Sequence, residues 1–401
     1  MSVANSPLLL TGLLLAATLA ANATSAAPNT FRPRGVPLRP IELRCEHLQD
    51  PLGIDETAPR LTWKLESTLR GQRQSAYQVL VASSLSLLAR NRGDLWDSGK
   101  VRGDTTTVAY AGKPLASRMR CYWKVRAWDR SGNAREWSRP ASWTMGLLQP
   151  SDWRAEWISY RDQSPLHTNR QELHLPPPRF YRKAFHASQP VRRATLYATA
   201  LGLYEMHLNG KRVGDALFTP GWTDYRRRVY YQTYDVTPLV SRGENALGAI
   251  VADGWYSGYV GYGLLVGYGP GRVGRYFYGK TPALLAQLEI EYADGSREIV
   301  GTGPDWKVTD RHPIREADIL MGERYDARLE IPDWSQARFD DSQWPSAVPA
   351  AANGSLRAKY YDAAGEREVE LGFIRPERLE AYPSVPVRAT QEIRPVRVTE
   401  P

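Results

Sequence analysis

Four acidic residues lie in segments with the composition of loops: Asp253, Glu316, Asp318 and Glu323. Carboxylates are the groups that hydrolyse most glycosidic bonds, with an acid and a base flanking the scissile bond roughly 5–9.5 Å apart. No two of these four residues have a spacing that is diagnostic of such a pair, and any β-sandwich carries as many acidic residues in its loops. The sequence therefore predicts no catalytic residue.

Metal and nucleotide motifs are not found either. None of the six histidines has the His-Glu-x-x-His spacing, and the two cysteines are not part of a Cys-x-x-Cys motif. Residues 254–258 fail the G-x-S-x-G pattern because the glycine spacing is wrong. Residues 269–274 fit G-x-G-x-x-G, but we expect neither the preceding strand nor the following helix that a dinucleotide site needs. We expect no metal and no cofactor.

Two segments rich in aromatic residues remain as candidate binding surfaces. One runs from Asp253 to Tyr268 among many glycines, and the other is Gly221 to Tyr225. Aromatic rings on a loop stack on sugar faces, or they form an apolar patch that docks on another domain, and we favour docking. The candidate residues are Trp222, Asp224, Tyr225, Asp253, Trp255, Tyr256, Tyr259 and Tyr262.

Short alternating strands must position these segments, which makes the expected class all-β. Runs at 61–65, 77–81 and 122–128 predict a fibronectin III- or Ig-like sandwich over residues 41–149. Residues 150–350 predict a jelly-roll-type sandwich. Its expected strands lie at 194–198, 204–208, 246–251, 284–292 and 298–300, with hairpin turns at Asn209-Gly210 and Asp294-Gly295.

The two cysteines, Cys45 and Cys121, both belong to the first predicted sandwich. Alternation places Cys121 on the same inward face as Trp123 and Val125, and Cys45 follows Leu43 with the same spacing. A disulfide across the sandwich and a pair of buried free thiols both fit this pattern.

The ends of the chain carry their own signals. The apolar run at 8–21, followed by small residues, predicts a signal peptide over 1–26 and a secreted or periplasmic protein, with a Pro- and Arg-rich linker at 27–40. No later run is long enough for a membrane span. Residues 351–401 predict a linker and the truncated start of a further β domain, because β character returns at 379–398 and the sequence stops within it.

The net charge of +9 comes mostly from arginines spread along the chain. A nucleic-acid-binding protein usually concentrates its basic residues in a stripe or a known motif. Neither is visible, so nucleic acid is not an expected partner. A basic exported protein favours acidic polysaccharides or anionic surfaces, although generic solubility charge explains the excess as well.

Several motifs together resemble the amino-terminal modules of bacterial α-L-rhamnosidases of glycoside hydrolase family 78. In the first block they are CEHL (45–48), PLGID (51–55), PRLTW (59–63), YWKVRAWD (122–129) and WS (137–138). In the second block they are ALGLYE (200–205), LNGKRVG (208–214), PGWTDY (220–225), YQTYDVT (231–237), NALG (245–248), DGWYSG (253–258) and GERYDAR (322–328).

The resemblance implies a role beside a catalytic domain. In that family an (α/α)₆ barrel follows the sandwiches, carries the catalytic carboxylates and removes terminal α-L-rhamnose from plant glycosides or pectin with inversion. We therefore expect a non-catalytic scaffold or docking portion that is inactive alone, with the barrel as partner and rhamnose-containing glycans as further ligands. The alternative is a free-standing carbohydrate-binding or adhesion protein. The connector at 160–178 is too short for the calcium-dependent module of some members, so we expect no calcium.

Overall fold

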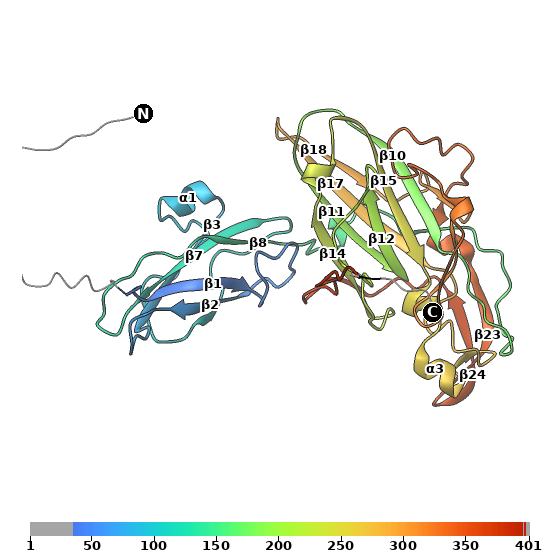
Figure 1. The fold of residues 1–401 in the computed structure, drawn as a ribbon, viewed down its shortest axis with the longest axis horizontal. Coiled ribbons are helices and arrows are strands. Elements are labelled where there is room, and N and C mark those ends of the chain that lie inside the picture. The colour runs from blue at the N-terminus through green and yellow to red at the C-terminus, as the bar shows by residue number, and fades with distance from the viewer. Residues whose placement is uncertain (1–34, 396, 398–401) are drawn as a thin grey trace, which may run out of the picture.

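The computed structural model describes residues 35–395 and residue 397, and it shows two β-sandwiches joined by a narrow waist (Figure 1). The predicted signal peptide lies outside the described residues, as does most of the predicted linker at 27–40. Within the described part of the chain, no helix is both long and apolar enough to cross a membrane. The prediction of an all-β chain built from two sandwiches is confirmed.

The first sandwich packs a three-stranded sheet in the order β1-β2-β6 against a sheet in the order β4-β3-β7-β8, where β5 also pairs with β3. The buried indoles of Trp123 and Trp143 lie in its core. Its elements are β1 (Arg39–Cys45), β2 (Arg60–Glu66), β3 (Ala76–Ala82), α1 (Leu85–Ala89), β4 (Trp96–Asp97), β5 (Val101–Arg102), β6 (Thr107–Ala109), β7 (Arg120–Trp128) and β8 (Ala141–Thr144).

Strand β7 shows how alternation divides side chains between core and surface. Cys121, Trp123 and Val125 are fully buried, as the period-2 pattern predicts. On the opposite face the guanidinium carbon of Arg126 lies 4.8 Å from the ring centre of Trp128 and 4.7 Å from that of Trp137. Arg126 thus lies between two indole rings on this face.

Both cysteines of the first sandwich are buried free thiols in the structure, without the disulfide that was one of the two alternatives. Burial raises the pKa of the Cys121 thiol to about 12 and also raises the pKa of Cys45. A thiol that stays protonated reacts slowly, so this pair acts as part of the apolar core.

The second sandwich packs a five-stranded sheet (β13-β12-β15-β10-β19) against a seven-stranded sheet (β22-β9-β17-β11-β14-β25, with β18 on β17). Its core is apolar and fully buried around Leu196, Leu247 and Trp306. The strands are β9 (Ile158–Ser159), β10 (Arg179–Ala187), β11 (Val191–Leu201), β12 (Leu203–Leu208), β13 (Lys211–Arg212), β14 (Arg228–Asp235), β15 (Gly243–Ala252), β17 (Ala283–Tyr292), β18 (Arg297–Gly301), β19 (Lys307–Thr309), β22 (Val348–Pro349) and β25 (Arg378–Ala381).

The hairpin turn predicted at Asn209-Gly210 is confirmed, because both residues have positive φ and join β12 to β13. Smaller elements surround the sandwich. They are η1 (Pro150–Asp152), η2 (Thr237–Leu239), α2 (Gly254–Ser257), α3 (Gly261–Val266), β16 (Gly269–Pro270), β20 (Ile314–Asp318), β21 (Gly322–Tyr325), η3 (Ala327–Leu329), η4 (Ala350–Asn353), β23 (Ser355–Asp362) and β24 (Gly365–Gly372).

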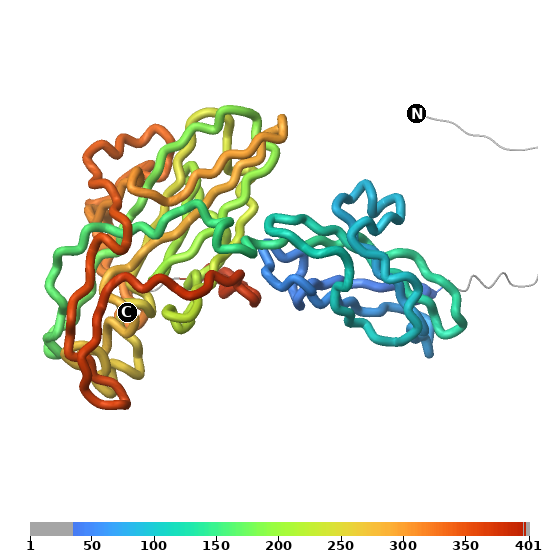
Figure 2. Tube along the Cα trace, turned by 180° about the vertical axis from the view of Figure 1, so that it is seen from behind, coloured from blue at the N-terminus to red at the C-terminus, as the bar shows by residue number. Residues whose placement is uncertain are grey.

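The region predicted as a linker and a truncated next domain belongs to the second sandwich instead. Strands β23 and β24 form a hairpin that pairs with β16, and β25 adds a parallel strand to β14. Seen from behind, this carboxy-terminal segment runs across the second sandwich toward the waist (Figure 2). The small residues at 350–354 suggested a linker, so the hairpin that follows them was not predicted. Leu371 of the hairpin is buried beside Val273 and Tyr276. Residues 385–395 form no strand, although β character was expected there.

Arg118 clamps the two sandwiches together at the waist. Its Nε and Nη2 donate to the two carboxylate oxygens of Glu289 on β17, each at 2.7 Å. Its Nη1 donates to Asp152 at 2.6 Å, in the segment that joins the sandwiches. The two carboxylates raise the pKa of Arg118 further, and the hydrogen bonds from Ser117 and Arg118 outweigh burial and lower the pKa of Asp152.

Two glycines allow the sandwiches to approach closely. A Cβ at Gly53 would lie 2.0 Å from the Thr233 hydroxyl, and one at Gly146 would lie 2.1 Å from the Tyr231 hydroxyl. That tyrosine hydroxyl accepts from the backbone N–H of Leu147 at 2.9 Å. The PLGID motif therefore has a physical role at the waist. Its glycine, Gly53, leaves room for Thr233 on β14, and its aspartate, Asp55, contacts β25.

Asp55 joins the first sandwich to the last strand of the second. Its carboxylate accepts from the backbone N–H of Ala381 at 2.8 Å. Burial outweighs this hydrogen bond and raises the pKa of Asp55. Segments that are 326 residues apart in sequence are thereby held together.

Replacing Arg118 with Met should destabilise the protein by roughly 2–4 kcal/mol, because two partly buried carboxylates lose their cation. Guanidinium chloride unfolding followed by tryptophan fluorescence measures this change. The matched control is Arg120→Met, since Arg120 reaches Asp235 only at 4.0 Å and should contribute less than about 0.5 kcal/mol. Equal losses in the two variants would contradict the clamp.

Candidate functional site

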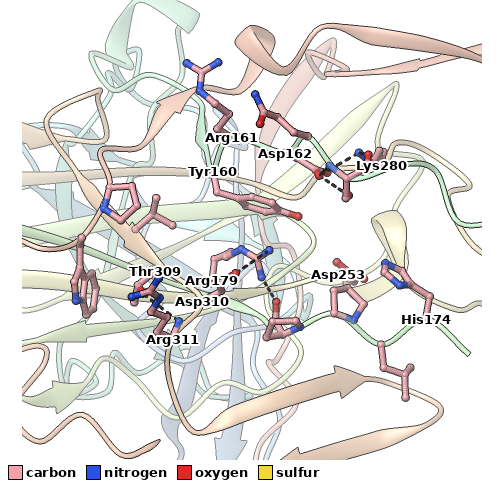
Figure 3. Close-up of a pocket in the computed structure, with 18 of the residues that line it drawn as sticks. Tyr160, Arg161, Asp162, His174, Arg179, Asp253, Lys280, Thr309, Asp310 and Arg311 are labelled. Carbon is pink, nitrogen blue, oxygen red and sulfur yellow. Dashed lines mark hydrogen bonds and ion pairs between the residues drawn. The ribbon is translucent and has the colours of Figure 1, made fainter.

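A cleft of about 960 Å³ opens at one end of the second sandwich (Figure 3). The connector between β9 and β10 forms one wall, and residues 308–311 with 343–346 form the other. Asp253, which follows β15, and residues 275–280 complete the lining. The walls are mostly segments outside the two large sheets, so side-chain contacts rather than ladder hydrogen bonds must hold them in place.

Arg275 is the main anchor of this cleft, and its side chain is almost completely buried. It forms an ion pair with Asp253 and donates to the backbone carbonyl of His174, so it joins three segments. The guanidinium carbon also lies 4.9 Å from the ring centre of Tyr259 and 5.0 Å from that of Tyr276. Burial alone would lower the pKa of Arg275, but Asp253 outweighs burial and the net direction is upward.

Asp162 and Lys280 form a second buried ion pair, 3.1 Å apart, on the opposite side of the cleft (Figure 3). Asp162 also accepts from the hydroxyl groups of Ser164 at 2.6 Å and Thr281 at 2.7 Å. Burial raises the pKa of this carboxyl, yet the hydrogen bonds from Ser164, Thr281 and Lys280 outweigh it and the pKa falls. Asp162 is therefore a fixed carboxylate with its position set by three partners.

Arg179 lies across the middle of the cleft. Its guanidinium carbon is 4.0 Å from the ring centre of Tyr160, and its Nη2 is 3.8 Å from the carboxylate of Asp310. Figure 3 shows the ring of Tyr160 against this guanidinium, with Arg161 directed away from it. Arg161 and Arg311 are exposed at the mouth of the cleft.

Two histidines support the walls. His174 stacks on His167, and burial together with the charge of Arg275 lowers the pKa of His174. His312 is fully buried, stacks on Phe180 at 4.1 Å and contacts the backbone carbonyl of Pro178 through Nε2 at 2.8 Å. Burial lowers the pKa of His312 to about 4. Both rings are neutral near pH 7, so they act as packing and hydrogen-bonding groups.

The acidic side chains of this cleft are held beside cations, an arrangement that suits ligand binding. Asp162 and Asp253 are each neutralised by a buried cation, and Asp310 lies near Arg179. A general acid needs a proton near neutral pH, which a carboxyl with a lowered pKa such as Asp162 does not hold. Among the described residues, no group of three or more His, Cys, Asp or Glu side chains is arranged to hold a metal ion.

The four acidic residues considered from the sequence have separate structural roles. Asp253 lies in the cleft, whereas Asp318 accepts from the backbone N–H groups of Tyr259 at 3.0 Å and Leu320 at 2.8 Å. Glu316 pairs with Arg324 at 2.8 Å, and Glu323 is exposed on β21.

Three of the predicted aromatic site residues are core residues, which corrects their expected place on a binding surface. Tyr225, Tyr256 and Tyr259 are buried, and Tyr225 packs edge-to-face on Tyr256 at 5.6 Å. The expected loop contains two short helices instead, and α2 carries Tyr256 inward. Gly279 leaves the space for that ring, since a Cβ there would lie 2.1 Å from the Tyr256 hydroxyl.

Of the other predicted residues, Asp253 is buried in the cleft, Trp255 is partly exposed, and Trp222, Asp224 and Tyr262 lie at the surface. Trp222 is 52% exposed and stacks on Trp255 with ring centres 5.9 Å apart and planes 3° from parallel. Phe218 is 50% exposed and lies 6.3 Å from Trp255. We call Phe218, Trp222 and Trp255 the aromatic patch. Tyr262 is 66% exposed on α3, and Asp224 caps the turn before β14 by accepting from the N–H of Arg226.

Sequence reasoning did not identify the cleft, apart from Asp253. Arg275 and Lys280 stand in a segment of glycines and tyrosines, where an isolated cation suggests no function. The available signal was chemical, because a charged residue among large aromatic residues is buried only when it is paired. Such reasoning predicts that Arg275 has a carboxylate partner. It does not identify Asp253 as that partner, because Asp253 is 22 residues away in the sequence.

Two sandwiches joined at a waist, with a polar cleft and a separate aromatic patch on the second, define a modular β-sandwich region. Residues 40–149 match the model for the Rha78A-like N-terminal immunoglobulin domain, and residues 189–368 match the model for the alpha-L-rhamnosidase N-terminal domain. The chain belongs to the α-L-rhamnosidase family as an N-terminal region of such a protein.

Known α-L-rhamnosidases are similar over most of this chain. One from Alteromonas sp. is 40% identical over 78% of the chain and 33% of its own length. One from Streptomyces avermitilis is 33% identical over 91% of the chain and 48% of its own length. The structure of the enzyme from Dictyoglumus thermophilum superposes with a TM-score of 0.72 at 33% identity, covering 90% of this chain and 37% of that one. The chain thus spans less than half the length of these relatives.

His312 makes the stability of the cleft wall dependent on pH. Its pKa is lower in the folded protein than its ordinary value of 6.5, so its contribution is complete above that pH and is lost as the pH falls toward 4. Acidification from about pH 7 to about pH 4.5 should remove up to about 3 kcal/mol through this residue. Urea unfolding of wild type and His312→Gln at both pH values measures this.

His312→Gln should be less stable near neutral pH but should lose less stability on acidification than the wild type. His47→Gln is the matched control, since His47 is exposed on the first sandwich and forms no ion pair among the described residues. If acidification weakened wild type and His312→Gln equally, the buried neutral imidazole would not be the cause.

Proposed function

We propose that this chain is the non-catalytic, amino-terminal scaffold of a secreted α-L-rhamnosidase, and that it docks on the catalytic domain. The observation that carries this proposal is the aromatic patch on a rigid sandwich whose relatives are longer α-L-rhamnosidases. The full enzyme would remove terminal α-L-rhamnose from plant glycosides or pectin, as the family resemblance implies. The apolar run at 8–21 supports export.

The physical form of the aromatic patch favours contact with a protein. Trp222 and Phe218 are each about half exposed. Rings of this size contribute most to binding free energy when a partner covers them, so their exposure favours docking. Trp255 anchors them because it packs against the core beneath. A rigid, preorganised apolar surface loses little conformational entropy on docking. The (α/α)₆ barrel implied by the family is the partner that fits this role.

The paired carboxylates of the cleft support the absence of hydrolysis by this region alone. Hydrolysis needs one protonated and one ionised carboxyl across the sugar, but Asp162 and Asp253 are each bound by a buried cation. We expect no release of nitrophenol when the purified chain is incubated with 4-nitrophenyl α-L-rhamnoside. The Dictyoglumus thermophilum enzyme in the same buffer is the positive control. Turnover that persists through successive purification steps would overturn the scaffold proposal.

Docking is tested by co-expressing the chain with the catalytic region of the Dictyoglumus thermophilum enzyme and measuring co-purification through a tag on that region. The chain should be recovered with the tagged region, and the double variant Trp222→Ala/Phe218→Ala should be recovered at least about tenfold less well. Leu85→Ala is the control, because Leu85 is equally exposed but lies on α1 of the first sandwich. Failure of wild type to co-purify, or equal recovery of all three proteins, would contradict docking through this patch.

A free-standing carbohydrate-binding protein is the second candidate, and the near-parallel rings of Trp222 and Trp255 favour it. The exposed indole of Trp222, held parallel to Trp255 beneath it, offers a flat ring face of the kind on which sugar rings stack. Calorimetric titration of the chain with L-rhamnose and with rhamnose-containing oligosaccharides separates the two functions. Binding that Trp222→Ala abolishes would favour this candidate, whereas the docking proposal expects no heat from the patch.

A further inference from the structure

The cleft of the second sandwich has the composition of a ligand site that the scaffold proposal does not use. None of its lining residues belongs to the aromatic patch. Its volume of about 960 Å³ is near the upper end of the range for small-molecule sites, roughly 300–1,000 Å³. A ligand of several linked rings would fit such a space.

The charges of the cleft are unevenly matched. Its lining contains five cationic side chains, Arg161, Arg179, Arg275, Lys280 and Arg311, and three carboxylates, Asp162, Asp253 and Asp310. Three of the cations lie beside these carboxylates, Lys280 at 3.1 Å, Arg179 at 3.8 Å and Arg275 in a close ion pair.

Arg161 and Arg311 have no ion-pair partner among the described residues, and both are exposed at the mouth. The lining therefore carries a surplus of two solvent-exposed guanidinium groups. Guanidinium groups bind carboxylates through paired hydrogen bonds, which makes a carboxylated ligand their natural complement.

The interior of the cleft selects against a densely charged ligand. Asp162, Asp253 and Asp310 each lie beside a cation, so the interior has no surplus positive charge to offset the closely spaced phosphates of a nucleic acid. The same carboxylates accept hydrogen bonds from hydroxyl groups, and the neighbouring Arg179 and Gln343 donate them. Hydroxyl groups both donate and accept hydrogen bonds, so a polyhydroxylated molecule matches this mixture of acceptors and donors.

The polar groups are also held in place before any ligand arrives. Asp162 accepts from Ser164, Thr281 and Lys280, and Arg179 is fixed against the ring of Tyr160 at 4.0 Å. Arg275 cannot move without breaking its contacts to Asp253 and His174. Preorganised groups lose little entropy on binding, so modest contacts suffice for measurable affinity.

We propose that this cleft binds an oligosaccharide containing hexuronate units, with Arg161 and Arg311 receiving the carboxylates and the paired interior receiving the hydroxyl groups. The site does not depend on docking of the aromatic patch or on catalysis elsewhere. It gives the second sandwich a recognition role for acidic glycans.

Isothermal titration of the purified chain with tri-galacturonate tests the proposal. Binding should be detectable and should weaken as sodium chloride rises from about 50 mM to about 500 mM. The double variant Arg161→Gln/Arg311→Gln should bind at least about tenfold more weakly. Both side chains are exposed, so the fold should be retained, and an unchanged thermal unfolding midpoint checks this.

The control variant Arg92→Gln/Arg242→Gln removes the same two charges from exposed positions outside the cleft and should bind as wild type does. A neutral galactose trisaccharide should bind at least about tenfold more weakly than the acidic one. The proposal is overturned if tri-galacturonate gives no heat, if the neutral sugar binds equally, or if the control pair loses as much affinity as the cleft pair.

Discussion

The buried guanidinium of Arg275 is the interaction on which the cleft depends. It joins the residue after β15, the connector before β10 and its own glycine-rich segment, none of which pairs in the large sheets at these points. Two tyrosine rings enclose its hydrocarbon and guanidinium surfaces. A buried cation is stable only beside a carboxylate and other acceptors, so Asp253 and His174 are constrained together with the two tyrosine rings. The same constraint explains why aromatic residues in this region turn inward and are not available to ligands.

The waist between the sandwiches follows a comparable principle. Arg118 uses three nitrogens to hold Glu289 and Asp152, and Gly53 and Gly146 remove the side chains that would separate the two modules. Buried Gln287 adds to this junction, because its amide oxygen accepts from the backbone N–H of Arg154 at 2.6 Å. Polar groups and missing side chains thus act together with the small apolar cluster of Leu147, Tyr197, Tyr231 and Ala381 to fix the orientation of one sandwich against the other.

Strands and turns were predictable from local pattern, whereas the site was not. Period-2 burial on β7 and the Asn209-Gly210 turn depend on neighbours in sequence, so alternation was enough to find them. Trp255 and Tyr256 are adjacent aromatic residues, yet Tyr256 is fully buried and Trp255 is partly exposed. Which ring turns inward is decided by distant partners such as Gly279 and Tyr225. The hairpin of β23 and β24 was missed for the same reason, since its apolar partner surface is contributed by Val273 and Tyr276.

The hydrogen bond from Ala381 to Asp55 has a consequence for synthesis of the chain. A polypeptide leaves the ribosome from its amino terminus, and domains generally fold as units during that time. The first sandwich contains all its own strands by residue 144, but β25 reaches its partner β14 and the waist only after residue 381 has emerged. Until then the surface of Asp55 and Tyr231 has no cover from this strand. Synthesis of this region therefore includes a closing step in which β25 locks a module that was made some 326 residues earlier.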